Sequence, residues 1–206
     1  MQAALDRFRK NVRGRYTEGT LLRLLDSPVP KARRAAVLAL GLVGTMNSSN
    51  KSVAAALRDE DRFVRQLASD ALWSIWFRAG NEANNRELRR LIQIADAKSA
   101  VAGLDALIIR CPKFAEAYNQ RATLHCRLGD YARSIADCAR ALKLNSCHFG
   151  ALSVMGQCFM KLKKPRAALK SFRSALAINP NLDGVEETIH FLENALGEEG
   201  RKDDKK

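Results

Sequence analysis

The segment AEAYNQRATLHCRLGDYARSIADCARALKLN, residues 115–145, holds two apolar stripes at helical spacing, separated by Gly129. Each stripe is typical of one face of a short amphipathic helix. Glycine readily takes the left-handed conformation that ends a helix, and Asp130 can cap the helix that follows. Two helices this short cannot bury all of their apolar surface against each other. The segment therefore predicts a helical hairpin that packs against neighbours of the same shape.

A second copy of the pattern begins 34 residues further on, at Phe149. Small residues recur where two helices must come close, and large residues recur where a gap must be filled. A period of 34 residues with this pattern resembles the tetratricopeptide repeat, a helix–turn–helix unit. One step back along the chain, Asn81 to Phe114 form a degenerate third unit. The matched pairs include Ala117 with Ala151, Ala122 with Gly156, His125 with Phe159, Cys138 with Phe172, Ala141 with Ala175 and Leu142 with Leu176.

The turns of this half predict where its helices begin and end. Pro165 suits the first turn of a helix, where its missing N–H is not needed. Residues 183–196 predict an end helix that covers the apolar face of the last repeat. The charged residues 197–206 are expected to be a disordered tail. The predicted helices are 82–94, 97–110, 115–128, 131–144, 149–162, 165–178 and 183–196.

Residues 17–79 repeat with a different period, of 32 residues. When the sequence is aligned with itself at this offset, the stretch from Leu24 to Leu40 matches the stretch from Ala56 to Leu72. This pattern resembles the short HEAT-like repeats related to those of phycobilisome lyases. The predicted helices are 18–26, 30–44, 50–58 and 61–78, with a further helix at 3–14 that closes the open end.

Arg33 and Arg65 occupy matched positions in the two copies of this repeat. The resemblance implies that such an arginine sits near the turn and bonds an acidic group or a carbonyl of the adjoining turn. Asp26 and Asp59 are the candidate partners. A contact to a ligand is the alternative role for these arginines.

The aromatic run WSIWF, residues 73–77, ends this half of the chain. We expect it to form a core that seals the HEAT-like layer onto the first tetratricopeptide helix, rather than a platform for stacking bases. The whole pattern predicts an all-α fold, an α-solenoid of HEAT-like and then tetratricopeptide repeats, wound as a right-handed superhelix. The expected domains are 1–80, then 81–196 with three tetratricopeptide units and a capping helix, then the tail.

The composition points to a basic protein of ordinary globular character. The 206 residues carry 35 Lys and Arg against 22 Asp and Glu, a formal net charge of +13. The excess is shared by both halves, so it permits nucleic acid, acidic proteins or anionic membranes as partners and selects none of them. The five cysteines include no CxxC pair, which favours reduced thiols within helices. No signal peptide or membrane-spanning run is recognised, and a cytoplasmic location is expected by default.

Catalytic motifs are not found in the sequence, and we expect a protein that is not an enzyme. His125 is expected to be packed in the core rather than to form a metal pair with Cys126, because adjacent helical residues point about 100° apart. Cys138 and Cys158 lie at packing positions, where a thiol behaves as a small apolar group. Neither a cofactor nor a metal site is predicted.

The candidate binding surface follows from the repeat architecture. In stacked helix pairs of this kind, the first helix of each unit lines the inner, concave face, and side chains four positions apart share a helix face. The resulting row is polar, with three cations and no carboxylate, which favours partner binding over a face that is only solvated. The row comprises Asn85, Arg89 and Gln93, then Asn119, Thr123 and Arg127, then Ser153, Gln157 and Lys161.

Three functional hypotheses are compatible with this pattern. The favoured one is a non-catalytic scaffold that binds a protein or an extended, acidic peptide in the concave groove. A clamp for the C-terminal carboxylate of chaperone tails is not expected, because Gly150 and Val154 stand where such grooves carry Lys and Arg. The second hypothesis is a nucleic-acid binder, and the third is an enzyme subunit whose active site lies in another chain. The basic segment that serves the second hypothesis comprises Arg7, Arg9, Lys10, Arg13 and Arg15.

Overall fold

The computed structural model describes the backbone of residues 2–197 and, within them, the side chains from residue 6 onwards. All regular secondary structure in this part of the chain is helical and none of it is strand, which confirms the predicted all-α fold. The chain divides into two compact units, one ending at Ala79 and the other beginning at Gly80. Except for Gly197, the tail predicted to be disordered lies outside the described residues.

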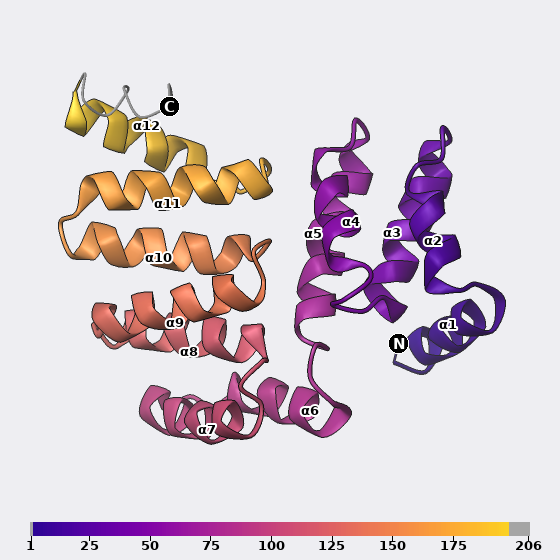
Figure 1. The fold of residues 1–206 in the computed structure, drawn as a ribbon, viewed down its shortest axis with the longest axis horizontal. Coiled ribbons are helices and arrows are strands. Elements are labelled where there is room, and N and C mark those ends of the chain that lie inside the picture. Colours follow the sequence, from indigo (N-terminus) through magenta and orange to yellow (C-terminus); the bar gives the residue numbers. More distant parts are fainter. Residues whose placement is uncertain (1, 198–206) are drawn as a thin grey trace. The chain divides into compact units, whose positions relative to one another are not determined.

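The helices follow the predicted boundaries closely. The first unit contains α1 (Gln2–Arg15), α2 (Glu18–Leu24), α3 (Pro30–Val43), α4 (Asn50–Ala55), the 3-10 turn η1 (Ala56–Arg58) and α5 (Arg62–Trp76). The second unit contains α6 (Glu82–Leu91), α7 (Ala97–Arg110), α8 (Ala115–Arg127), α9 (Tyr131–Leu144), α10 (Phe149–Lys161), α11 (Pro165–Ile178) and α12 (Val185–Leu196) (Figure 1).

The core of the first unit lies between α3 and α5, which pack closely along their length. Gly41 allows this approach, because a Cβ atom there would lie 3.0 Å from the Cβ atom of Ala71. Trp76 is 1% exposed, and its indole N–H donates a hydrogen bond of 2.7 Å to the side chain of Asn50. The aromatic run therefore contributes a core residue to its own unit, while the seal onto the following helix stays a prediction.

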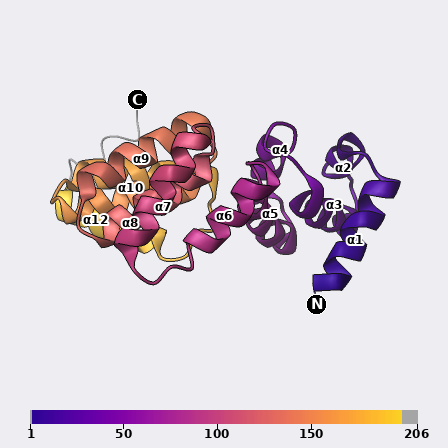
Figure 2. The ribbon, with the colours of Figure 1, turned by 90° about the horizontal axis from the view of Figure 1, so that it is seen from below.

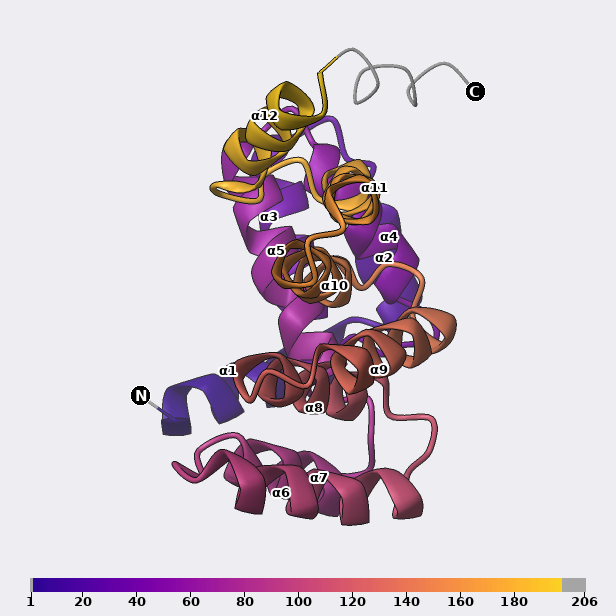
Figure 3. The same ribbon diagram turned by 90° about the vertical axis from the view of Figure 1, so that its left-hand side faces the viewer.

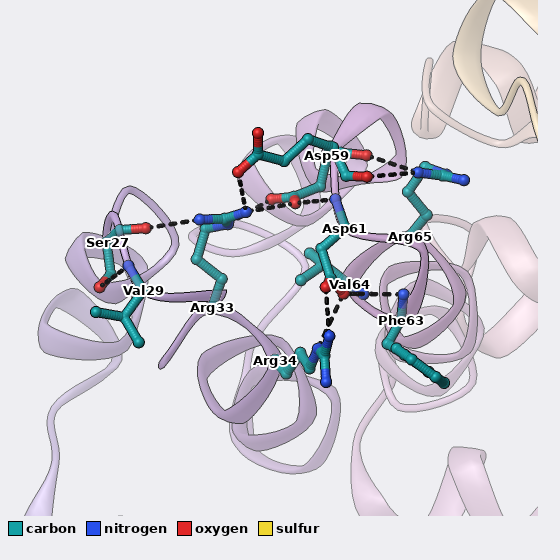
Figure 4. Close-up of polar contacts among 10 residues, drawn as sticks. Ser27, Val29, Arg33, Arg34, Asp59, Asp61, Phe63, Val64 and Arg65 are labelled. Atoms are coloured by element: carbon teal, nitrogen blue, oxygen red, sulfur yellow. Dashed lines mark hydrogen bonds and ion pairs between the residues drawn. The ribbon is translucent and has the colours of Figure 1, made fainter. Parts of the chain in front are cut away.

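The matched arginines bond the turns of the first unit, as predicted (Figure 4). Arg33 donates to the backbone carbonyl of Ser27, and Arg65 donates to that of Asp59, in each case six residues earlier. Arg33 also reaches forward to the next turn, where it donates two hydrogen bonds of 2.8 Å to the carboxylate of Asp59. The prediction of Asp26 as a partner was wrong. The carbonyl of Ser27 takes its place, because a backbone acceptor in the turn is already within reach.

A second arginine strengthens the same junction. Arg34 Nε donates to Asp61 Oδ1 at 2.9 Å, and the same carboxylate accepts the backbone N–H groups of Phe63 and Val64 at the start of α5. The hydrogen bond from Arg34 lowers the pKa of Asp61 below its ordinary value. Although burial alone raises the pKa of Asp59, its hydrogen bond with Arg33 brings the net pKa down as well.

These lowered pKa values predict that the first unit loses stability in acid. A carboxylate with a depressed folded-state pKa stabilises the fold fully above its unfolded value of about 3.9 and stops doing so as the pH falls through the folded value. We therefore expect D61N to lower the urea midpoint at pH 7, and this difference from the wild type to shrink at pH 3. Asparagine still caps the helix, so the change isolates the charge. The fluorescence of Trp73 and Trp76, the two tryptophans of the chain, reports this unit. An equal loss at both pH values would contradict the prediction.

The second unit is a stack of helix pairs (Figure 3). The helices α8 and α9 form one hairpin, α10 and α11 form the next, and α9 packs against α10. Gly129 has a φ of +82°, and Asp130 caps α9 by accepting the backbone N–H of Arg133. Pro165 is the first residue of α11, as predicted. The repeat pattern in the sequence thus predicts both turns correctly.

Two ends of the second unit complete the stack. Ile189 and Leu192 of α12 pack on the α11 side chains of Leu169 and Phe172, so α12 covers the last repeat as predicted. At the other end, α6 stops at Leu91, three residues before its predicted end. The next three N–H groups bond carbonyls only three or four residues back and close the helix as tight turns.

Candidate functional site

The predicted binding row shows a gradient of exposure along each first helix. Asn85 and Asn119 are buried, Thr123 and Ser153 are half-buried, and the later positions are exposed. The gradient has a simple geometric cause. Four helical residues advance about 400°, so each step of the row drifts about 40° around the helix towards solvent. The exposed members are Arg89, Gln93, Arg127, Gln157 and Lys161.

The buried and half-buried members of the row bond within the unit. The Asn85 side chain accepts the backbone N–H of Gly80 at 3.0 Å and donates to the carbonyl of Gly80 at 2.9 Å. The Thr123 hydroxyl donates to a backbone carbonyl one turn earlier in α8. The Ser153 hydroxyl does the same in α10. These contacts leave the exposed members of the row, three cations and two glutamines, as the side chains that are accessible to a partner.

A buried ionisable pair connects the first helices of two repeats. Glu116 at the start of α8 and His148 at the start of α10 are both fully buried, and His148 Nε2 lies 2.9 Å from Glu116 Oε2. His148 Nδ1 accepts the backbone N–H of Ala151, so the proton on Nε2 is donated to Glu116. The other carboxylate oxygen accepts from Gln120 at 2.6 Å. Because the protein encloses the Glu116 carboxylate, it must keep its hydrogen bond to His148. The pair therefore fixes the register between α8 and α10.

A pocket of about 650 Å³ lies on the second unit, and no member of the predicted row lines it. Its lining comes from α7, α8 and α9 and combines apolar side chains with an ionic cluster. In this cluster Arg121 donates to Asp137 at 2.7 and 2.6 Å and to Asp105 at 2.7 Å. The lining residues are Val101, Asp105, Ile108, Ile109, Arg121, His125, Arg133, Ala136 and Asp137.

The side chains that sequence reasoning singled out for chemistry are mostly packed. His125 is 5% exposed, in agreement with its predicted core position. Burial raises the pKa of the Cys138 thiol, and it raises the pKa of the Cys158 thiol to about 11, so both favour the protonated form. The Cys158 thiol contacts the Ser134 hydroxyl at 3.1 Å. From residue 2 to residue 197, no group of three or more His, Cys, Asp or Glu side chains is placed to hold a metal ion.

Sequence reasoning missed the ionic contacts of Arg121, Glu116 and His148. Each joins helices that the repeat pattern predicts to be neighbours, but each depends on the rotation of those helices about their axes. One signal was present, since Arg121 stands where the next repeat has Met155, at a position that faces the adjoining helices. An arginine at such a position predicts a buried acidic partner.

Two segments of the second unit match known family models. Residues 115–146 and residues 150–182 each match the tetratricopeptide repeat. These two segments are tetratricopeptide repeats. Each match spans one hairpin, α8–α9 or α10–α11, so the resemblance on which the fold prediction rested is confirmed for these two units. The matches begin at residue 115, and the degenerate unit formed by α6 and α7 stays a prediction.

A TPR repeat-containing protein of Rhizobium etli is 30% identical over 123 residues, which cover 56% of this chain and 60% of that protein. Among solved structures, the first TPR of Spaghetti (RPAP3) bound to an HSP90 peptide is 23% identical, with a TM-score of 0.49, over 56% of this chain and 88% of that one. The TPR2B domain of yeast Sti1 in its pHsp70 complex is 19% identical, with a TM-score of 0.49, over 55% of this chain and 96% of that one. No helix among residues 2–197 is long and apolar enough to cross a membrane.

Proposed function

We propose that this protein is a non-catalytic scaffold whose tetratricopeptide repeats bind a protein or an extended peptide during the assembly or regulation of a complex. Tetratricopeptide units stack helices in a way that presents one helix per repeat to a partner. The observation that carries the proposal is the row of exposed cations on those helices, Arg89, Arg127 and Lys161. A partner with acidic side chains at intervals fits this row best.

The arrangement of charges supports an acidic partner. The acidic side chain that lies nearest to the row on α8, Glu116, is fully buried and bonded to His148. It therefore offers no exposed negative charge to repel an acidic peptide. Exposed Gln157 can donate and accept hydrogen bonds with an extended backbone. In the first unit, the two turn-bonding arginines Arg33 and Arg65 support the HEAT-like interpretation of residues 17–79.

Replacing the three cations together tests the proposal. Each exposed charge contact is worth about 0.2–1 kcal/mol, so R89A/R127A/K161A should weaken partner binding by about 0.6–3 kcal/mol in total. The melting temperature should change little, because all three side chains are exposed. The partner is first isolated by affinity purification with the wild type and then titrated against both proteins by calorimetry.

The matched control removes an equal charge elsewhere on the second unit. K98A/K143A/K170A replaces three exposed lysines of the second helices α7, α9 and α11. This variant should bind the partner with nearly the affinity of the wild type. Unchanged affinity of the R89A/R127A/K161A variant, with the protein folded, would remove the first-helix row from the binding surface.

A further inference from the structure

Helix α1 carries a concentrated positive charge in the first unit. It contains five basic residues and one acidic residue. The acidic residue, Asp6, is itself exposed and forms an ion pair with Arg9, with Nη1 of the arginine 3.5 Å from Oδ1 of the carboxylate. The basic residues with exposed side chains are Arg7, Lys10, Arg13 and Arg15.

Three of these cations form one face of α1. Arg7, Lys10 and Arg13 follow one another at intervals of three residues, which places them on one side of the helix about 4.5 Å apart along its axis. Val12 lies on the other side and is 6% exposed. The helix packs against α3, across one end of the α2 and α3 pair (Figure 2). The basic face therefore points away from the body of its own unit, and we call these three residues the α1 cation row.

The chemistry of the α1 cation row selects a particular kind of polyanion. A helix that binds a membrane surface inserts a continuous free apolar face, whereas from residue 6 onwards α1 has one packed apolar side chain, Val12, and one exposed one, Phe8. Single-stranded nucleic acid is held by aromatic platforms among the cations. Phe8, 42% exposed, lies about 100° or more around the helix from each member of the row. A nucleic-acid duplex needs neither a free apolar face nor an aromatic platform, because its dense, regular array of phosphates can contact the α1 cation row directly.

We propose that the α1 cation row binds the phosphate backbone of a nucleic-acid duplex, without reading its bases. This surface belongs to the first unit and does not depend on the binding function proposed for the tetratricopeptide repeats. Three phosphate contacts release counterions, so the logarithm of the binding constant should fall with the logarithm of the salt concentration with a slope of about −3.

The test is fluorescence anisotropy of the full chain with a labelled 20-base-pair DNA duplex between 50 and 200 mM KCl. R7A/K10A/R13A should weaken binding at least about tenfold at 50 mM KCl and bring the slope close to zero. The matched control is K98A/K143A/K170A, which lowers the net charge by the same amount at three exposed lysines outside both proposed binding surfaces and should keep both the affinity and the slope. Circular dichroism confirms that each variant is folded.

Several results would overturn the assignment. An equal loss in both variants would show attraction by net charge alone, and no salt-dependent binding by the wild type would show no phosphate contact. Tighter binding of a 20-nucleotide single strand, lost in R7A/K10A/R13A, would replace the duplex by a single strand as the ligand. Binding to phosphatidylserine vesicles that depends on the row, with no binding to the duplex, would assign α1 to a membrane surface. Retention of wild-type duplex affinity by folded R7A/K10A/R13A would remove α1 from the interface.

Discussion

Replacing Arg121 by leucine should lower the melting temperature of the protein by about 4–12 °C. The Arg121 guanidinium joins α8 to Asp137 of α9 and to Asp105 of α7, and the Asp137 side chain is 9% exposed. Removing the arginine leaves a buried carboxylate without its counter-charge, which costs about 3–5 kcal/mol in a dry site. The Arg121 side chain is 19% exposed, so solvent screening reduces this to about 2–3 kcal/mol. A protein of this size shifts by about 2–4 °C for each kcal/mol.

The double variant R121L/D137L is the matched control for this effect. It removes both buried charges at once and leaves only Asp105, 51% exposed, without the arginine, so no buried carboxylate is left unpaired and most of the lost stability should return. Thermal unfolding followed by circular dichroism at 222 nm measures all three proteins. If R121L melts within about 1 °C of the wild type, the contact contributes little and Asp137 finds another stabilising partner. If the double variant is no more stable than R121L, lost packing rather than unpaired charge is the cause.

Repeat periodicity predicted the helices because the period is imposed by stacking itself. Each unit must bury its apolar stripe against the next, so residues such as Ala117 and Ala151 recur at equal spacing. The resemblance of residues 17–79 to HEAT-like repeats also offered Asp59 as one of two candidate acidic partners for the matched arginines, and Asp59 bonds Arg33. Contacts that repeat with the architecture can therefore be predicted from one sequence.

The candidate site was less predictable because exposure depends on helix rotation. Asn119 and Arg127 are both polar and lie eight residues apart on α8, yet one is buried and the other exposed. Their side chains differ by about 80° in direction around the helix, and the sequence pattern does not resolve a difference of that size. The Arg121 contacts depend on the same rotation, and they also need carboxylates from two other helices. The pocket beside these contacts depends on the distances between α7, α8 and α9. No sequence pattern within one helix encodes those distances.

Replacing Gly156 by alanine should lower the free energy of unfolding by about 1–2 kcal/mol. A Cβ atom at this position of α10 would lie 2.8 Å from two ring atoms of Phe172 in α11. Phe172 is 4% exposed and is packed beneath α12, so its ring has little room to move. Overpacking of this kind costs about 1–3 kcal/mol, and the better helix propensity of alanine returns up to about 1 kcal/mol.

The preceding repeat explains why the glycine is needed only here. It carries Ala122 and Cys138 at the two equivalent positions, so a larger residue on the first helix faces a smaller one on the second. The two side chains of each pair thus fill the space between their helices in different proportions, with Gly156 and Phe172 in one repeat and Ala122 and Cys138 in the other. If this is so, G156A should be better tolerated once Phe172 is made smaller. A double-mutant cycle of G156A and F172L, measured by urea unfolding, should give a coupling energy of about 1 kcal/mol or more. Additive effects would mean that Gly156 is required for its backbone rather than for the space that it leaves to Phe172.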